Sequence, residues 1–167
     1  MTRNVLRVVS IVFLTIPASA FAGSASDNMS VSATVSDSCT ISAGDLSFGA
    51  YDTVAGSAVA GSAVLSVACT TGAAANVTLD QGANPGGGSS DADPDRWMSD
   101  GASNLLSYSL FQDSGHTTEW GNTSGTGVSY SAASSAASNI SVYGQIDASQ
   151  DVPAGSYSDT VVATISF

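Results

Sequence analysis

The chain has 167 residues, a formal net charge of −11 and only 10% charged residues. Its three arginines, one histidine and absence of lysine exclude the clustered basic surface that nucleic acids or anionic membranes require. With 43% hydrophobic residues the chain can still form a core, and its length favours one domain. Because a single histidine makes a histidine-based metal centre hard to assemble, we expect no metal and no cofactor.

Residues 1–22 have the pattern of a secretory signal peptide. Two arginines precede the nine-residue run VVSIVFLTI at 8–16, and Ala20-Phe21-Ala22 matches a cleavage site. We therefore expect cleavage between Ala22 and Gly23. The run is far shorter than the roughly 20 residues of a membrane-spanning helix. The exported part would keep all fourteen acidic residues and one arginine, a net charge of −13.

The exported part predicts strands and almost no helix, since apolar residues do not recur every three to four positions. Met29 to Val35 alternates strictly between apolar and polar residues. Further strands are expected at 63–69, 75–79, 105–111, 140–146 and 160–167, between turn-rich segments at 80–90, 114–127 and 147–155. Residues 83–95 are the longest loop candidate. Short strands separated by such turns predict an all-β sandwich or barrel.

Cys39 and Cys69 both lie in the exported part. An even pair of cysteines in an oxidising compartment indicates a disulfide. The alternative, a redox or zinc site, needs close spacing and partner ligands that this pair lacks.

The two ends of the exported chain complement each other. Val161, Ala163, Ile165 and Phe167 share one face of a last strand that would form an exposed apolar edge. The alternating segment at 29–35 is a spare strand with few groups to hold it to its own domain. A spare strand and a missing neighbour suggest strand addition between copies. Such a contact is head-to-tail and builds open filaments.

Two acidic patterns favour a structural interpretation. Asp91 to Asp95 resembles the start of a calcium loop, but Arg96 and Ala102 stand where glycine and glutamate are needed. A solvated acidic loop is favoured, with weak calcium binding as the alternative. Asp113-Ser114-Gly115 matches aspartic proteases, but the second such motif is missing. A turn at a strand end is therefore favoured.

The remaining candidates also favour structural roles. His116 has no partner in an evident motif, and no G-x-S-x-G elbow is present. For Trp97, Trp120 and Tyr143, packing in the sandwich is favoured over stacking on a sugar. We expect no enzyme activity and no small-molecule substrate, and we expect a structural ion pair at Arg96.

Several segments together resemble the spore coat protein U domain family, which includes pilins of the archaic (Csu-type) chaperone–usher pathway. Each motif alone is weak, but their order and spacing over about 120 residues carry the resemblance. The matching segments are 28–41 (NMSVSATVSDSCTI), 46–51 (LSFGAY), Cys69, 96–98 (RWM), 106–113 (LSYSLFQD), Trp120-Gly121, 142–146 (VYGQI) and 150–161 (QDVPAGSYSDTV).

The resemblance implies an incomplete immunoglobulin-like β-sandwich at 36–167 that lacks its last strand. Residues 23–35 would be a donor-strand extension that completes the next subunit by donor-strand exchange. Its side chains Met29, Val31, Ala33 and Val35 would fill an acceptor groove, with 161–167 as one wall. Ala33 departs from the family, which often has a larger aliphatic residue there, and its burial contributes less.

The implied function is that of a structural subunit of a secreted pilus or fimbria serving adhesion and biofilm formation. Its partners would be identical or related pilins, a periplasmic chaperone and an outer-membrane usher, and not nucleic acid. The Phe167 carboxylate would anchor basic residues of the chaperone. Such a subunit passes through the periplasm to the cell surface. A spore or cell coat protein, or a minor or tip subunit with a binding role, is the alternative.

Overall fold

The computed structural model describes residues 22–167 and divides the chain into the units Met1–Thr34 and Val35–Phe167. Residues 22–34 of the first unit contain no strand or helix, and their side chains are exposed. Except for Ala22, the expected signal peptide lies outside the described residues. Within the described residues, no helix is long and apolar enough to cross a membrane.

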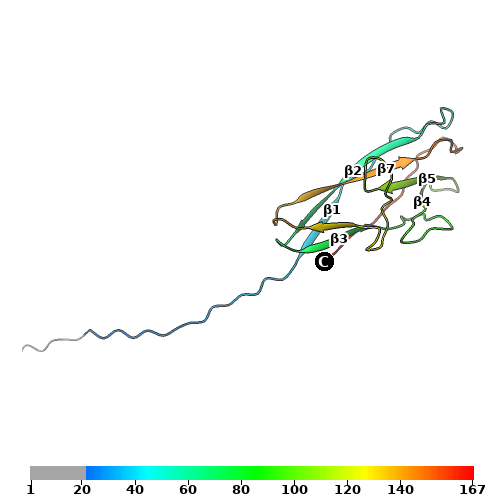
Figure 1. Cartoon of the computed structure of the whole chain (residues 1–167). Helices are drawn as coiled ribbons and strands as arrows, with labels where there is room; N and C mark the ends of the chain where they lie inside the picture. Colours follow the sequence, from blue (N-terminus) through cyan, green and yellow to red (C-terminus); the bar gives the residue numbers. More distant parts are fainter. Residues whose placement is uncertain (1–21) are drawn as a thin grey trace, which may run out of the picture. The chain divides into compact units, whose positions relative to one another are not determined.

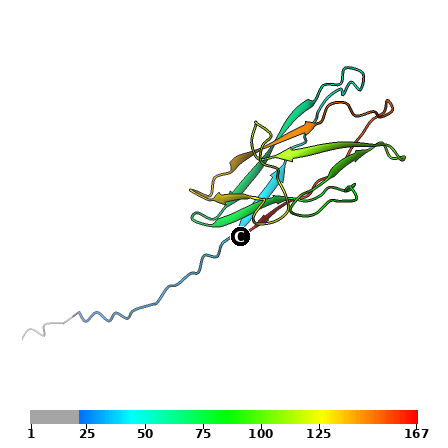
Figure 2. The same cartoon turned by 45° about the vertical axis from the view of Figure 1, so that its right-hand side comes forward.

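The second unit is an antiparallel sandwich of two sheets (Figures 1 and 2). The five-stranded sheet has the order β1-β2-β7-β5-β4, and the three-stranded sheet has the order β6-β3-β8. The strands are β1 (Cys39–Ala43), β2 (Val59–Cys69), β3 (Ala74–Leu79), β4 (Arg96–Ser99), β5 (Leu105–Phe111), β6 (Val128–Ser131), β7 (Ser138–Ile146) and β8 (Ala163–Ser166). This architecture is the expected all-β, immunoglobulin-like fold.

The core lies between the two sheets. Leu106, Tyr108 and Leu110 share one face of β5 and are buried, as their alternation predicted. Trp120 is fully buried, and its indole N–H donates to the Val77 carbonyl. The other buried apolar residues are Leu65, Val67, Cys69, Ala73, Val77, Leu79, Ala132, Val142 and Ile146.

The strands expected at 63–69, 75–79, 105–111, 140–146 and 160–167 are present, most with shifted ends, whereas the alternating segment from Met29 to Val35 forms no strand. The strand at 105–111 has the predicted bounds, whereas β2 begins at Val59 and β8 covers only Ala163–Ser166. The sequence did not reveal β1, β4 and β6, because strands of four or five residues are too short for a clear alternation. Cross-strand partners hold these three in place: β1 pairs with β2, β4 with β5, and β6 with β3.

Candidate functional site

Strand β8 has an unpaired edge. It pairs with β3 on one side, and it is the last strand of its sheet in the described part of the chain. The main-chain groups of Val162 point toward β3. Its carbonyl accepts from Asp80 N, and its N–H donates to the Asp80 carboxylate. Main-chain groups alternate in direction along an antiparallel strand. The N–H and C=O groups of Val161, Ala163 and Ile165 therefore point to the open edge.

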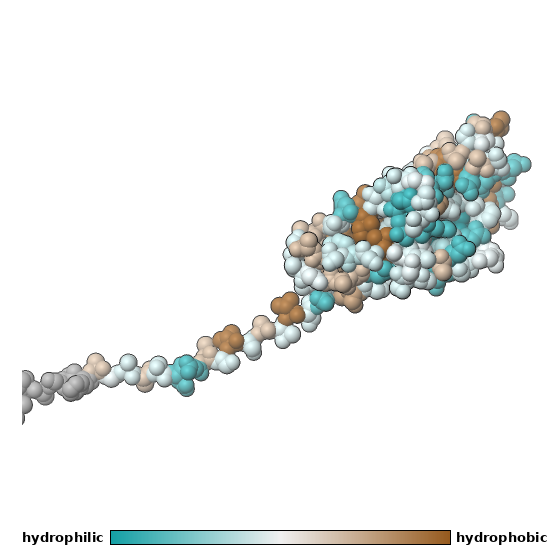
Figure 3. All heavy atoms as spheres, viewed as in Figure 1, coloured by the Kyte–Doolittle hydropathy of each residue, from teal (hydrophilic) through white to brown (hydrophobic). Residues whose placement is uncertain are grey.

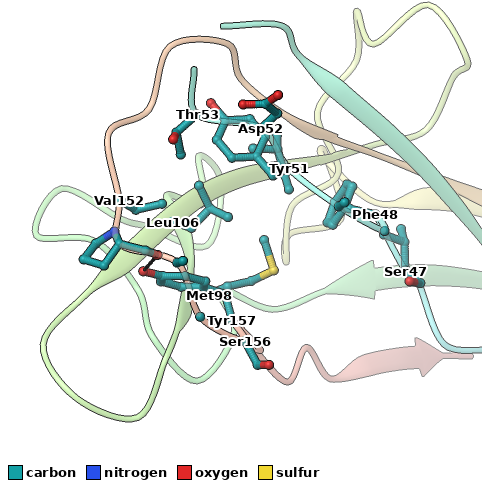
Figure 4. A pocket seen from close by; sticks show the side chains of 17 residues that line it. Ser47, Phe48, Tyr51, Asp52, Thr53, Met98, Leu106, Val152, Ser156 and Tyr157 are labelled. Carbon is teal, nitrogen blue, oxygen red and sulfur yellow. Dashed lines mark hydrogen bonds between the residues drawn. The ribbon is translucent and has the colours of Figure 1, made fainter. Parts of the chain in front are cut away.

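A groove lies beside this edge and contains two cavities of about 440 and 660 Å³. Ala43 at the end of β1, Val161 and Ala163 line the smaller cavity. Tyr51, Leu106 and Val152 line the larger one, and Figure 4 shows their side chains gathered around it. Both cavities have the size of ligand-binding sites. The groove is thus a space of mixed apolar and polar lining, and a further strand can pair with β8 along the smaller cavity.

The opposite rim of the groove is residues 44–53. Gly44 N still donates to the Val64 carbonyl, but among the described residues Asp45–Ala50 make no main-chain hydrogen bond to another main-chain group. Beyond this stretch, Tyr51 anchors the rim, since its hydroxyl donates to the Asp147 carbonyl and accepts from Gln150 N. Both rims therefore have main-chain groups free to bond with an inserted strand.

Two paired glycines set the floor of the groove. Gly61 on β2 lies directly opposite Gly144 on β7, and Leu46 and Phe48 pack over them. A β-carbon at Gly144 would lie 2.8 Å from Phe48 Cζ, and one at Gly61 would lie 3.1 Å from Leu46 Cδ2. Any larger residue would push these side chains outward. The glycines therefore let Leu46 and Phe48 lie against the main chain of the sheet.

Arg96 is fully buried and anchors the β8 rim. Its guanidinium donates to the main-chain carbonyls of Asp80 (2.8 Å), Leu79 (3.1 Å) and Trp120 (2.7 Å). These carbonyl bonds take the place of the ion pair that we expected. Because Asp80 in turn bonds Val162, Arg96 fixes the point where the chain enters β8. Burial lowers the pKa of Arg96 from its usual value, which arginine tolerates while remaining charged.

A second polar contact holds the rim just before β8. The Tyr108 hydroxyl donates to the Asp159 carboxylate at 2.7 Å, and both residues line the smaller cavity. The same carboxylate accepts from Ala83 N and from the Asn84 side chain. Burial, together with this hydrogen bond to Asp159, raises the pKa of Tyr108 far above its usual value. The phenol therefore stays protonated and donates at any physiological pH.

The residues expected in the donor strand are exposed. Met29, Val31 and Val35 are 86%, 83% and 83% exposed, and Ala33 is also exposed. Hydrophobic side chains recur between polar ones along this segment (Figure 3). Ala22 and Gly23, at the expected cleavage point, lie outside any strand. In a strand with such alternation, the apolar side chains share one face, and that face is normally buried. Here it is exposed.

The residues expected to form the acceptor wall behave differently from one another. Val161 and Ala163 line the groove, and Ile165 is half-buried on the same face. Phe167 is 60% exposed, lies beyond the end of β8 and lines neither cavity. The sequence reasoning also missed the opposite wall, formed by Leu46, Phe48 and Tyr51. These residues drew attention only as a family motif.

The expected disulfide joins Cys39 and Cys69. The two residues are direct partners in the β1–β2 register. Next to them, Thr70 N donates to the Ser38 carbonyl, and Ser38 N donates to the Thr70 hydroxyl. The chain entering β1 is therefore tied to β2 from residue 38 onward.

The other candidates have structural contacts. The Asp113 carboxylate accepts from the main chain of residues 115, 117 and 118, and its pKa is lowered, chiefly by the Thr118 N–H. His116 packs its ring edge-to-face against Phe111. Asp91 accepts from the side-chain amides of Gln81 and Asn122. In the described part of the chain, no group of three or more His, Cys, Asp or Glu residues is arranged to hold a metal.

The comparisons with known proteins agree with this architecture. The model of the spore coat protein U domain matches residues 25–164. Protein U of Myxococcus xanthus is 41% identical over 156 residues, with 87% of each chain covered. A chain of the CsuC–CsuE chaperone–tip adhesion subunit pre-assembly complex, from archaic chaperone–usher Csu pili of Acinetobacter baumannii, matches with a TM-score of 0.55. That match has 21% identity and covers 80% of this chain but only 40% of the solved chain.

The fold and the open edge define an immunoglobulin-like sandwich that is incomplete at one sheet edge. The chain belongs to the spore coat protein U domain family. Proteins of this family are structural and not enzymes.

Proposed function

We propose that this chain is the repeating subunit of an exported filament that assembles by donor-strand exchange. Residues 29–35 of one copy would occupy the groove beside β8 of the next copy. The observation that carries the proposal is the groove itself, which has unpaired main chain on both rims. The exposed alternating segment of the same chain has the complementary pattern.

The physical gain of this assembly has two sources. The inserted strand bonds to main-chain groups of Val161, Ala163 and Ile165, which otherwise form an exposed edge. Its apolar face leaves water, which contributes about 1.5–3 kcal/mol for each large side chain and less for Ala33. Dissociation requires withdrawal of the whole strand, so the polymer would be kinetically stable.

The direction of the inserted strand decides between a filament and a closed pair. The C-terminus lies near the start of β1 (Figures 1 and 2), and Val35 precedes β1 by only four residues. A donor strand parallel to β8 would bring together the ends of the two subunits at which β1 starts. Each subunit could then insert its segment into the other and form a closed pair. An antiparallel donor places the next subunit beyond the opposite end of the groove. That contact is heterologous and continues indefinitely.

The family supports a route through the periplasm to the cell surface. A strand of a periplasmic chaperone would first fill the acceptor groove. At an outer-membrane usher, the donor segment of the next subunit would replace it. The exposed Phe167, just beyond the end of β8, would present its carboxylate to basic chaperone residues. The chaperone–pilin complex among the structural matches supports a chaperone partner. Adhesion and biofilm formation would be the roles of the filament.

A coat protein of spores or cells is the second candidate, and the spore coat domain shared with Protein U favours it. Donor-strand exchange would serve a coat as well as a pilus. A minor or tip subunit is a variant of the first candidate, since the matched solved complex contains a tip adhesion subunit. This chain, however, covers only 40% of the solved chain and has its own donor segment. Electron microscopy of material sheared from cells distinguishes filaments from a coat.

Deletion of residues 23–35 tests the proposal in the native host, with residues 1–22 kept so that export is unchanged. Unboiled samples run on denaturing gels should lose the ladder of polymers, while the boiled monomer stays detectable. A matched control replaces Ser30, Ser32 and Thr34 by alanine, which leaves the apolar face intact and should preserve the ladder. A normal ladder from the deleted chain would refute donor-strand exchange.

A further inference from the structure

The groove is divided by a ridge of four side chains. Leu46, Phe48, Met98 and Tyr157 line both cavities and so lie where the two meet. Leu46 and Phe48 come from one rim, and Tyr157 comes from the other. Figure 4 shows Phe48 across the larger cavity from Tyr157, whose hydroxyl donates to the Pro153 carbonyl next to Val152. An inserted strand must cross this ridge to reach both cavities.

The ridge cannot move down to make room. Leu46 and Phe48 already lie over the Gly61–Gly144 pair, so close that a β-carbon at either glycine would meet their atoms at 2.8–3.2 Å. Phe48 also packs edge-to-face against Tyr108, with ring centroids 6.0 Å apart. Because the floor beneath is main chain, a large donor side chain above the ridge would have to push the whole donor strand outward.

The donor segment contains one small residue among three large ones. Its inward positions are Met29, Val31, Ala33 and Val35. Alternate side chains of a strand are about 6.5–7 Å apart. When one of them lies over the ridge, its two neighbours therefore fall on either side of it, one toward each cavity. Only Ala33 is both small and flanked by large apolar residues on both sides.

We propose that Ala33 of the incoming subunit lies over the Leu46–Phe48 ridge and thereby fixes the register of the donor strand. This inference rests on the proposed donor-strand exchange and on its antiparallel direction. Val35 then enters the 660 Å³ cavity beside Val152, and Val31 enters the 440 Å³ cavity beside Val161 and Ala163. The small residue at position 33 matches the shape of the acceptor groove of this chain.

Enlarging Ala33 tests the register in the full chain and the native host. The Ala33→Leu variant should reduce the polymer ladder about tenfold, which corresponds to overpacking against a rigid floor. The matched control is Ser32→Leu, which adds the same side chain at an outward-facing position of the donor segment and should leave the ladder nearly unchanged. Equal loss from both variants would show that position 33 has no special place and would overturn the register.

Variants with a smaller ridge provide the complementary measurement. Combining Ala33→Leu with Leu46→Ala should restore the ladder, because every copy is both donor and acceptor. If Leu46→Ala alone prevents accumulation of the subunit, Phe48→Leu offers the same relief with a smaller loss of packing. A block by Ala33→Leu that neither ridge variant relieves would also overturn the register.

The register and the proposed function fail in different ways. A normal ladder from Ala33→Leu, together with loss of the ladder on deletion of 23–35, overturns the register alone. A normal ladder from the deleted chain overturns donor-strand exchange itself.

Discussion

At the scale of single residues, Arg96 shows how the groove rim is held. It is the single arginine of residues 22–167, and it is buried. It therefore does not lie among the acidic side chains on the surface. Its guanidinium binds three carbonyls that come from the end of β3 and from Trp120. A planar fork of donors can satisfy acceptors in several directions at once, which a single ammonium cannot.

The Arg96→Lys substitution should therefore destabilise the subunit although it keeps the charge. At least one buried carbonyl would lose its partner, at a cost of about 1–3 kcal/mol. Chemical denaturation of the full chain measures the effect. Ser129→Ala, at an exposed position of β6, serves as the control and should change stability by less than about 0.5 kcal/mol. Equal stability of wild type and Arg96→Lys would mean that the carbonyl contacts are not required.

At the scale of elements, β1 and β8 form the edges beside the groove, and each is held by one neighbouring strand. Asp80 bonds Val162 at the start of β8, and the Cys39–Cys69 disulfide joins β1 to β2. β1 has only five residues and lies at the edge of its sheet. The covalent link is therefore an important constraint on the segment that connects residues 29–35 to the domain.

Replacing both Cys39 and Cys69 by serine should lower the unfolding free energy by about 3–4 kcal/mol, because the closed loop spans about 30 residues. Urea denaturation with and without a reducing agent measures the change. The reductant should destabilise the wild type and leave the double variant unaffected. Identical urea midpoints for wild type and double variant would contradict the prediction.

At the scale of the whole molecule, charge is unbalanced. Residues 22–167 have fourteen carboxylates, and their one arginine is buried. Mutual repulsion of like charges keeps a protein soluble but opposes its compact state. In a filament the same charge would recur in every subunit, so association brings further repulsion that salt can screen.

We expect the melting temperature to rise when sodium chloride is increased from about 10 to 500 mM, since the Debye length shortens from about 30 Å to a few ångströms. Potassium chloride should act equally, because screening depends on ionic strength. Calcium at matched ionic strength serves as a test of the loop at 91–95. A larger rise with calcium, abolished by Asp93→Asn, would indicate a calcium site there instead of a solvated loop. A melting temperature independent of salt would contradict the electrostatic account.

Much of the fold could be predicted because alternation is a local property. The buried face of β5 and the inward face of 161–165 follow from every-second-residue patterns, and the turn-rich segments are free of strands. β4 could not be predicted in this way. It begins with Arg96, a residue that alone suggests exposure, and that residue is buried because its carbonyl partners lie about 17 and 24 positions away in the chain.

The sequence by itself determined the all-β class, the cysteine pair and the alternating segment at 29–35, because these depend on neighbouring residues or on composition. Only the tertiary structure decided which segments form the groove beside the open edge of β8. It brought residues 44–53 and 152–163, about 100 positions apart, to opposite walls of one groove. It also placed Gly61 opposite Gly144 beneath Leu46 and Phe48. Such contacts arise from packing between distant segments, which no local pattern encodes.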